Sequence, residues 1–70
     1  MLITFNGKDI EVEKGVTVAE VLKANGYGLK FVIVQLDEDV VDHHEYESTT
    51  IEEEGAEIEA DFLVGGGNKL

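Results

Sequence analysis

Three consecutive glycines, Gly65, Gly66 and Gly67, follow an apolar run near the carboxyl end of the chain, in the stretch FLVGGGNKL. Glycine has no side chain, so this segment itself offers no acid, base or nucleophile. It offers instead a backbone that adopts several conformations and passes through channels where a Cβ atom would clash. The alternative interpretation is a frayed end, because terminal residues are often poorly ordered.

Two other stretches contain residues that could bind a cation. Residues 42–45, with the sequence DHHE, place His43 beside His44, but adjacent side chains point in different directions and no second pair would close a tetrahedral zinc site. Residues 52–54 are consecutive glutamates without the spaced oxygen ligands of a calcium loop. We interpret both stretches as solvated turns and predict neither a metal site nor a catalytic residue.

Length and charge limit the classes of protein and partner. The chain has 70 residues, 43% of them hydrophobic, which is enough for one small folded domain. Sixteen acidic residues against five lysines give a net charge of −11, and such a surface repels nucleic acids and anionic membranes. Solubility alone would explain this charge, and a basic protein surface is the kind of partner that it would favour.

The sequence also indicates a compartment. Cysteine is absent, so disulfides and thiol chemistry cannot belong to this chain. No apolar run approaches the length of a membrane span, and the first residues, MLITFNGKDI, do not read as a signal peptide. We expect a cytoplasmic protein that is a monomer when alone.

The first part of the chain predicts a hairpin followed by a helix. Apolar and polar residues alternate on both sides of Asn6-Gly7, a pair that tolerates the positive φ angles of a tight turn. Thr17 followed by Glu20 is a capping-box signature, so a helix is predicted from about Val18 to Asn25. Gly26 follows where a left-handed residue commonly ends a helix. The stretch NGYG thus ends a helix instead of opening one, so we predict no phosphate-binding loop.

The rest of the chain predicts strands and short elements. Residues 31–36, FVIVQL, form an apolar run typical of a central strand, and residues 37–39 a solvated turn. Residues 40–47 suggest a short edge strand and one helical turn. Residues 56–64, AEIEADFLV, alternate as a last strand with an apolar face.

This order of elements predicts an α+β fold of the β-grasp, or ubiquitin-like, type. In that roll a mixed sheet of four to five strands curls around one main helix, with the last strand beside the first. The same elements in another strand order would give an α+β sandwich, which periodicity alone does not separate. The predicted core residues are apolar positions on the inward faces of these elements: Ile3, Phe5, Ile10, Val12, Val18, Val21, Leu22, Ile33, Ile58 and Phe62.

The order and spacing of three stretches carry a resemblance to a known family. ITFNGKDIEVEKGVTVAEVL, then IVQLDEDVV, then EIEADFLVGGG resemble the ThiS/MoaD family of ubiquitin-like sulfur carriers, most closely its ThiS branch of thiamine biosynthesis. The resemblance covers nearly the whole chain. Its most specific part is a strand that ends at Val64 and runs straight into three glycines. The turn at residues 54–57 departs from the pattern, because it reads EGAE where the family often has a Gly-Asp turn.

The resemblance implies a carrier that is a substrate and not an enzyme. In the family, a ThiF/MoeB-like adenylating enzyme uses ATP to activate the C-terminal glycine carboxylate, and sulfur relayed from a persulfide converts it to a thiocarboxylate. A thiazole synthase then accepts the sulfur. By this resemblance Gly67, or alternatively Gly66, carries the sulfur, and Gly65 belongs to the same tail. Leu63 and Val64 are expected to contact a partner, and this chain itself is expected to bind no cofactor.

The last three residues, Asn68-Lys69-Leu70, depart from the family's free glycine end. We expect a processing protease to remove them and expose Gly67; a relative that carries no sulfur is the alternative. The expected organisation is a β-grasp domain over residues 1–64 and a flexible tail over residues 65–70.

Other functions within this fold stay open. The sulfur could go to molybdopterin or to cysteine and homocysteine synthesis instead of thiazole. The chain could also be a ubiquitin-like protein modifier or a non-catalytic interaction module. An enzyme is the least favoured class, because no acid–base or nucleophile constellation is present.

Overall fold

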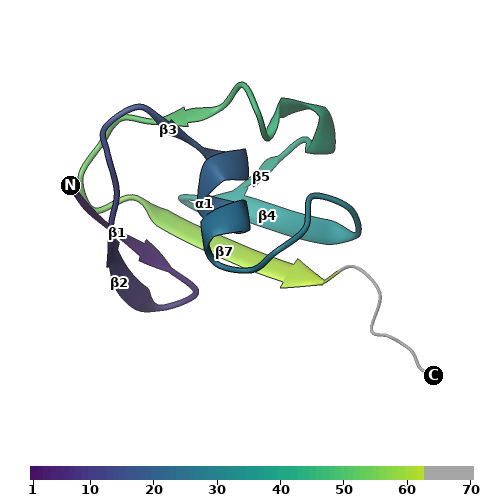
Figure 1. Cartoon of the computed structure of the whole chain (residues 1–70), viewed down its shortest axis with the longest axis horizontal. Helices are drawn as coiled ribbons and strands as arrows, with labels where there is room; N and C mark the ends of the chain where they lie inside the picture. Colours follow the sequence, from purple (N-terminus) through teal and green to yellow (C-terminus); the bar gives the residue numbers. More distant parts are fainter. Residues whose placement is uncertain (63–70) are drawn as a thin grey trace.

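The computed structural model describes residues 1–62, and Figure 1 shows how their elements are arranged. In chain order these are β1 (Leu2–Phe5), β2 (Lys8–Glu11), β3 (Val16–Thr17), α1 (Val18–Ala24), β4 (Val32–Leu36), β5 (Asp39–Val41), the 3-10 helix η1 (His43–Glu45), β6 (Thr50–Ile51) and β7 (Glu57–Phe62). In this part of the chain the larger sheet has the strand order β2-β1-β7-β4-β5, and β3 pairs with β6 in a second, two-stranded sheet.

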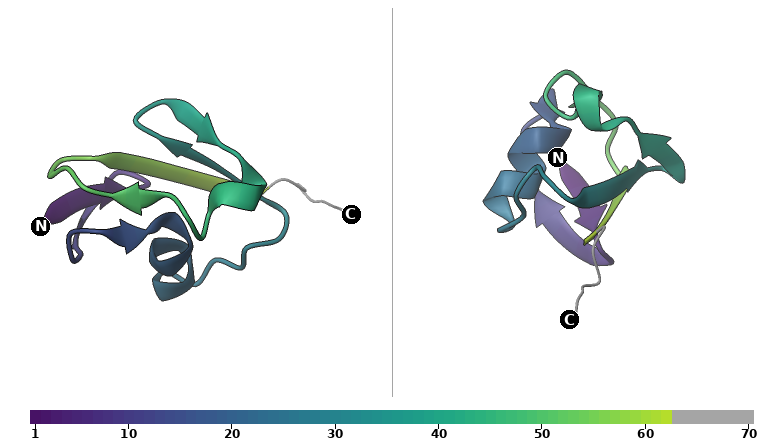
Figure 2. Two further views of the ribbon diagram at one scale, coloured as in Figure 1. Left: turned by 90° about the horizontal axis from the view of Figure 1, so that it is seen from above. Right: turned by 90° about the vertical axis from the view of Figure 1, so that its right-hand side faces the viewer.

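The larger sheet is mixed, and the last strand lies at its centre. Strand β7 runs parallel to β1 and antiparallel to β4, while β1–β2 and β4–β5 are antiparallel hairpins. Helix α1 lies against one face of the sheet, as the two views of Figure 2 show. The described residues thus confirm the predicted α+β, β-grasp fold with the last strand inserted beside the first. The boundary predicted at residue 64 lies outside them.

The predicted hairpin turn and helix start are both confirmed in detail. Phe5 pairs with Lys8, and Asn6 and Gly7 have φ angles of 51° and 84°, so the turn has two residues, both in the left-handed region of a type I′ turn. At the helix start, the Thr17 hydroxyl accepts a hydrogen bond from the Glu20 amide, 3.1 Å, and the Glu20 carboxylate accepts one from the Thr17 amide, 3.0 Å. Both halves of the capping box are therefore formed.

The core lies between α1 and the sheet. Predicted core residues confirmed as buried are Ile3, Phe5, Val18, Val21, Leu22 and Ile58, and Ile10 and Val12 pack against them half-buried. Two predicted core positions are wrong, because Ile33 is 42% exposed and Phe62 is 60% exposed. Ile33 lies on the sheet face turned away from α1, between buried Val32 and Val34. Phe62 lies at the end of β7, beyond the cover that α1 provides.

Several buried residues were missing from the predicted core: Ala19 of α1, Val32 and Val34 of β4, and Tyr46, Ile51, Ala56 and Ala60 from the segments that follow. Strand β6 brings Ile51 opposite Val16 of β3, and this pairing of two-residue strands closes the core next to the start of α1.

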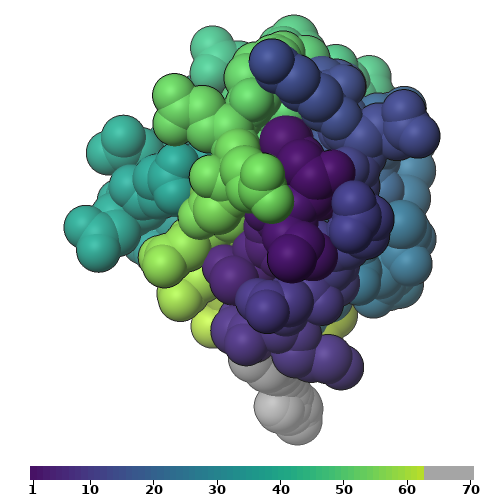
Figure 3. All heavy atoms as spheres, turned by 90° about the vertical axis from the view of Figure 1, so that its left-hand side faces the viewer, coloured from purple at the N-terminus to yellow at the C-terminus, as the bar shows by residue number. Residues whose placement is uncertain are grey.

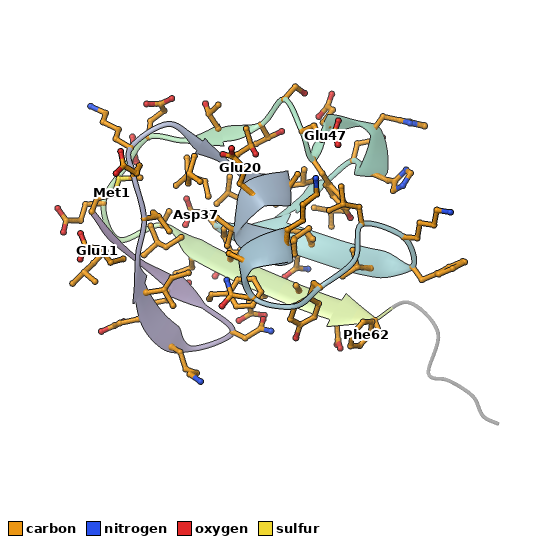
Figure 4. All side chains as sticks on the ribbon, in the orientation of Figure 1. Met1, Glu11, Glu20, Asp37, Glu47 and Phe62 are labelled. Carbon is orange, nitrogen blue, oxygen red and sulfur yellow. The ribbon has the colours of Figure 1, made fainter. Side chains whose placement is uncertain are left out.

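The chain begins at the end of the sheet opposite the end of β7. The Met1 amino group donates to the Glu11 carboxylate at 3.0 Å, and Figure 4 shows both residues far from Phe62. From this end, Figure 3 shows the β1–β2 hairpin beside the segment that leads into β7, with the β4–β5 hairpin projecting to one side. Within residues 1–62, α1 is too short to cross a membrane, and none of the helices there is long and apolar enough.

Candidate functional site

The predicted site residues follow directly on β7 in the sequence. These residues, Leu63, Val64, Gly65, Gly66 and Gly67, all lie outside the described part of the chain, so their predicted roles stay predictions. The structure does describe the strand that leads to them. In Figure 1, β7 crosses the centre of the sheet and ends on the side away from the N-terminus.

Alternation along β7 explains how this strand is held. Ile58 and Ala60 are buried against the core, while Glu57, Glu59 and Asp61 are exposed on the opposite face. Five residue pairs join β7 to β4, from Leu36 with Ile58 to Val32 with Phe62. The strand is therefore anchored on its β4 side along nearly its whole length, up to its last residue.

On its other side, β7 is anchored by two residue pairs with β1 and by two side chains. The pairing with β1 stops at Phe5 and Ile58. Beyond it, the Asn6 side chain accepts from the Ala60 amide at 2.8 Å and donates to the Ala60 carbonyl at 3.2 Å. The Tyr27 ring stacks on Phe62, with centroids 5.1 Å apart and an interplanar angle of 18°. The end of β7 is thus contacted from the β1–β2 turn and from the end of α1.

Three exposed apolar side chains lie at this end of the sheet: Ile33 is on the face turned away from α1, Phe62 shares the α1 face with its partner Val32, and Phe31 precedes β4. Phe31, Ile33 and Phe62 are 64%, 42% and 60% exposed, and Val32 pairs with Phe62, so β4 begins where β7 ends. We call these three residues the tail-end patch. Phe31 has a φ angle of 61°, a conformation that is strained for a bulky aromatic residue. Strained backbone that holds a large apolar side chain in solvent is a feature that often accompanies a binding function.

Acidic side chains form a row beside the tail-end patch. On the face turned away from α1, Glu57, Glu59 and Asp61 follow one another along β7, and Asp61 lies opposite Ile33. A groove at this end of the sheet is lined by Glu59 and Asp61 of this row, by Ile33 and Phe62 of the patch, and by Asn6 and Tyr27. This combination of apolar and acidic groups suits a protein partner with apolar and basic side chains.

Asn6, Tyr27, Phe31 and Ile33 were not predicted as site residues from the sequence. Asn6 was assigned to the turn alone, and Ile33 to the core. Only the order of the elements could have indicated these residues. A last strand that is parallel to β1 ends beside the β1–β2 turn, and an antiparallel β4 begins where that strand ends. No side-chain pattern in the sequence indicates the Asn6–Ala60 contact.

The adjacent histidines lie in η1, away from the end of β7. The Asp42 carboxylate accepts from the His44 amide at 2.9 Å and caps this turn, and the His43 and His44 rings meet edge to face. Among residues 1–62, no group of three or more His, Asp or Glu side chains is placed to hold a metal ion. Next to this turn, Tyr46 is buried and its hydroxyl donates to the Val32 carbonyl at 2.8 Å, which gives it a structural role.

Comparisons with known proteins agree on one family. The model of the ThiS family matches residues 3–67, a range that ends at Gly67 and leaves out the last three residues. The crystal structure of a thiamine biosynthesis protein, ThiS, from Geobacter metallireducens is 30% identical with a TM-score of 0.77, covering 96% of this chain and 100% of that one. An NMR structure of a thiamine biosynthesis protein from the same organism is 32% identical with a TM-score of 0.74. This match covers 100% of this chain and 91% of that one. No curated protein matched the chain.

Proposed function

The chain belongs to the ThiS family, and on this basis we propose that it is a sulfur carrier protein of thiamine biosynthesis. In this role the chain is the substrate of its partner enzymes and not a catalyst. The group that reacts is the carboxylate of Gly67 after the removal of Asn68-Lys69-Leu70. The observation that carries the proposal is the extent of the family match, which runs through all three glycines and stops at Gly67.

The proposed reaction has three steps, all catalysed by partners. A ThiF/MoeB-like adenylating enzyme joins the Gly67 carboxylate to the AMP part of ATP, and pyrophosphate leaves. The terminal sulfur of a partner's persulfide then attacks the acyl carbon and displaces AMP, which gives an acyl disulfide. A thiol of the partner attacks the other sulfur of this disulfide, forms a new disulfide with it, and releases the thiocarboxylate. A thiazole synthase accepts this sulfur. Glycine suits the first step because a segment without Cβ atoms fits a narrow channel into an active site.

The tail-end patch is the proposed docking surface for the adenylating enzyme. It lies at the end of β7 from which the tail starts, so a partner that holds the patch also holds the start of the tail. Two matched variants test this. Ile33→Thr removes an apolar side chain of the patch that is 42% exposed, and Leu2→Thr removes one that is 44% exposed on β1, towards the start of β7. Docking through the patch predicts weaker binding of the first variant alone.

Intact mass tests the sulfur-carrier function. A chain ending at Gly67 and the full chain are each incubated with the cognate adenylating enzyme, ATP and sulfide. We expect the shorter chain to gain the mass difference between sulfur and oxygen, and the full chain to stay unchanged until a protease removes the last three residues. Ladders of larger conjugates would indicate a protein modifier instead. An unchanged mass of the shorter chain, in the presence of an active enzyme, contradicts the proposal.

A further inference from the structure

Strand β7 extends beyond its partner β1, and a side chain takes over the pairing. The β1–β7 ladder ends where Phe5 lies opposite Ile58, and the chain of β1 then turns away at Asn6. The backbone groups of Ala60 on this side would be the next to pair. Asn6 satisfies both of them, since its Oδ1 accepts from the Ala60 N–H at 2.8 Å and its Nδ2 donates to the Ala60 carbonyl at 3.2 Å.

The turn holds the Asn6 side chain in place for this contact. Asn6 has a φ angle of 51°, in the left-handed region that asparagine tolerates, and its own amide donates to the Ile58 carbonyl at 2.8 Å. The backbone of Asn6 therefore binds Ile58, and its side chain binds Ala60. One residue thus continues the sheet by a further step after its strand has ended.

Tyr27 completes the contact from the other side. Its hydroxyl accepts from the Asn6 Nδ2 at 3.1 Å, and its ring stacks on Phe62 and meets Phe5 edge to face. The Tyr27 amide donates to the Leu22 carbonyl at 2.8 Å, and the preceding Gly26 has a φ angle of 85°, which is the geometry of a Schellman helix end. The backbone of Tyr27 is therefore fixed by α1, independently of β7.

We propose that Asn6 and Tyr27 form a latch that fixes the last residues of β7 and so sets the point from which the tail enters a partner's active site. The inference rests on the proposed function, because it assigns positioning residues for the reaction of the tail. The Asn6 turn is closed by β1 with β2 and the Tyr27 turn by the end of α1, so both latch residues give the last residues of β7 a reference outside that strand. A strand end held on its β4 side alone would leave the tail a wider range of directions, and fewer encounters would place the carboxylate correctly.

A graded series at position 6 separates the latch from the turn. Asn-Gly, Asp-Gly and Gly-Gly are all favoured in type I′ turns, so Asn6→Asp and Asn6→Gly keep the turn. Asn6→Asp keeps the acceptor for the Ala60 N–H but loses the donor to the Ala60 carbonyl, and Asn6→Gly loses both. Tyr27→Phe keeps the stacking on Phe62 and removes only the hydroxyl. Thr17→Ala, which removes the helix cap away from β7, is a control for a general loss of stability.

The measurement is ATP–pyrophosphate exchange by the cognate adenylating enzyme, with carrier chains ending at Gly67 and with the full chain in parallel. The latch predicts that kcat falls from wild type to Asn6→Asp to Asn6→Gly, by about tenfold in the last, which is the order of magnitude expected when both hydrogen bonds to Ala60 are lost. KM for the carrier should stay within about twofold, because the side chains of the tail-end patch are unchanged in these variants. Amide hydrogen exchange at Ala60 and Phe62 should accelerate while exchange at Leu22 does not.

Each other outcome has a defined meaning. Equal kcat values for wild type and Asn6→Gly, or equal losses in Asn6→Gly and Thr17→Ala, overturn the latch while the sulfur-carrier function stands. A rise in KM at constant kcat also overturns it, because Asn6 would then contact the partner directly. No exchange with the wild-type chain ending at Gly67, with an active enzyme, overturns the proposed function and with it the role of the latch in the reaction.

Discussion

Asn6 and Asp37 occupy the same position in two different hairpins, and each binds the backbone of β7 through its side chain. Both are the first residue of a two-residue turn, and both have a φ angle of 51°. Asn6 Oδ1 accepts from the Ala60 amide at 2.8 Å, and Asp37 Oδ1 accepts from the Glu57 amide at 2.9 Å. The two neighbouring hairpins therefore hold the central strand near its opposite ends, and Figure 4 shows Asp37 far from Phe62 along β7.

Loss of the Asp37 acceptor should destabilise the fold. In Asp37→Gly the positive φ angle is retained without strain, but the Glu57 amide loses a hydrogen-bond partner, so we expect the free energy of unfolding to fall by about 1 kcal/mol. Asp37→Asn keeps an oxygen acceptor and tolerates the same φ angle, so its loss should be smaller. Urea denaturation of the three proteins measures the difference. Equal stability of the glycine and asparagine variants would contradict a role for the acceptor.

The second residue of the same turn offers a stabilising substitution. Glu38 has a φ angle of 73°. A residue with a Cβ atom is strained in this conformation, whereas glycine is not. Glu38→Gly also creates an Asp-Gly pair, so we expect a gain of about 0.5–1 kcal/mol in the free energy of unfolding. Glu47→Gly is the control, because it removes the same charge at a residue without a positive φ angle, and it should not stabilise. A gain in the free energy of unfolding of both variants would indicate instead that the loss of a negative charge stabilises the protein.

Local signals in the sequence were sufficient for the elements that form through local contacts. The Asn6-Gly7 pair predicted a hairpin turn, and Thr17 with Glu20 predicted the helix start, because each motif satisfies its own backbone groups. Alternation placed Ile58 and Ala60 on the buried face of β7. The mixed β-grasp arrangement followed from the order of these elements together with the family resemblance.

Predictions of buried residues and contacts were less accurate where elements that are distant in the sequence meet. Alternation shows which residues share a face of a strand but not where the cover over that face ends, so Phe62 was wrongly assigned to the core. Because β4 is apolar along nearly its whole length, its sequence does not show which residues face the core. Ile33 was therefore wrongly assigned to the core as well. Tyr46 follows a 3-10 turn and contacts Val32, 14 residues earlier in the sequence, and the Asn6–Ala60 contact joins residues 54 apart. Such contacts depend on the tertiary arrangement.

The strained aromatic residue of the tail-end patch should show a conflict between stability and binding. Asparagine tolerates the φ angle of 61° at position 31, so Phe31→Asn should raise the free energy of unfolding by about 1 kcal/mol. The same variant removes an exposed apolar contact and should weaken binding to the adenylating enzyme. Ile33→Thr should weaken binding without the gain in stability. Calorimetric titration and urea denaturation check both effects, and unchanged binding of both variants would exclude the patch as the docking surface.

The buried hydroxyl of Tyr46 should make stability depend on alkaline pH. Burial, and to a lesser degree the nearby Asp42 carboxylate, raise the pKa of Tyr46 above its ordinary value of 10.0, while a backbone hydrogen bond from Val34 acts in the opposite direction. The folded state therefore favours the neutral hydroxyl. The unfolded chain loses this proton near the ordinary pKa, so the contribution is complete below about pH 10 and is lost as the pH rises through the folded pKa.

Tyr46→Phe tests both the hydrogen bond and the pH dependence. Without the hydroxyl, the Val32 carbonyl loses its donor, so the free energy of unfolding at neutral pH should fall by about 1–2 kcal/mol. Because phenylalanine does not titrate, the further loss of stability between neutral and alkaline pH should be smaller in this variant than in wild type. Tyr27→Phe removes the other tyrosine hydroxyl and retains Tyr46, so its alkaline loss should resemble that of wild type. Urea denaturation across this pH range measures all three proteins, and an undiminished alkaline loss in Tyr46→Phe would assign the effect to another group.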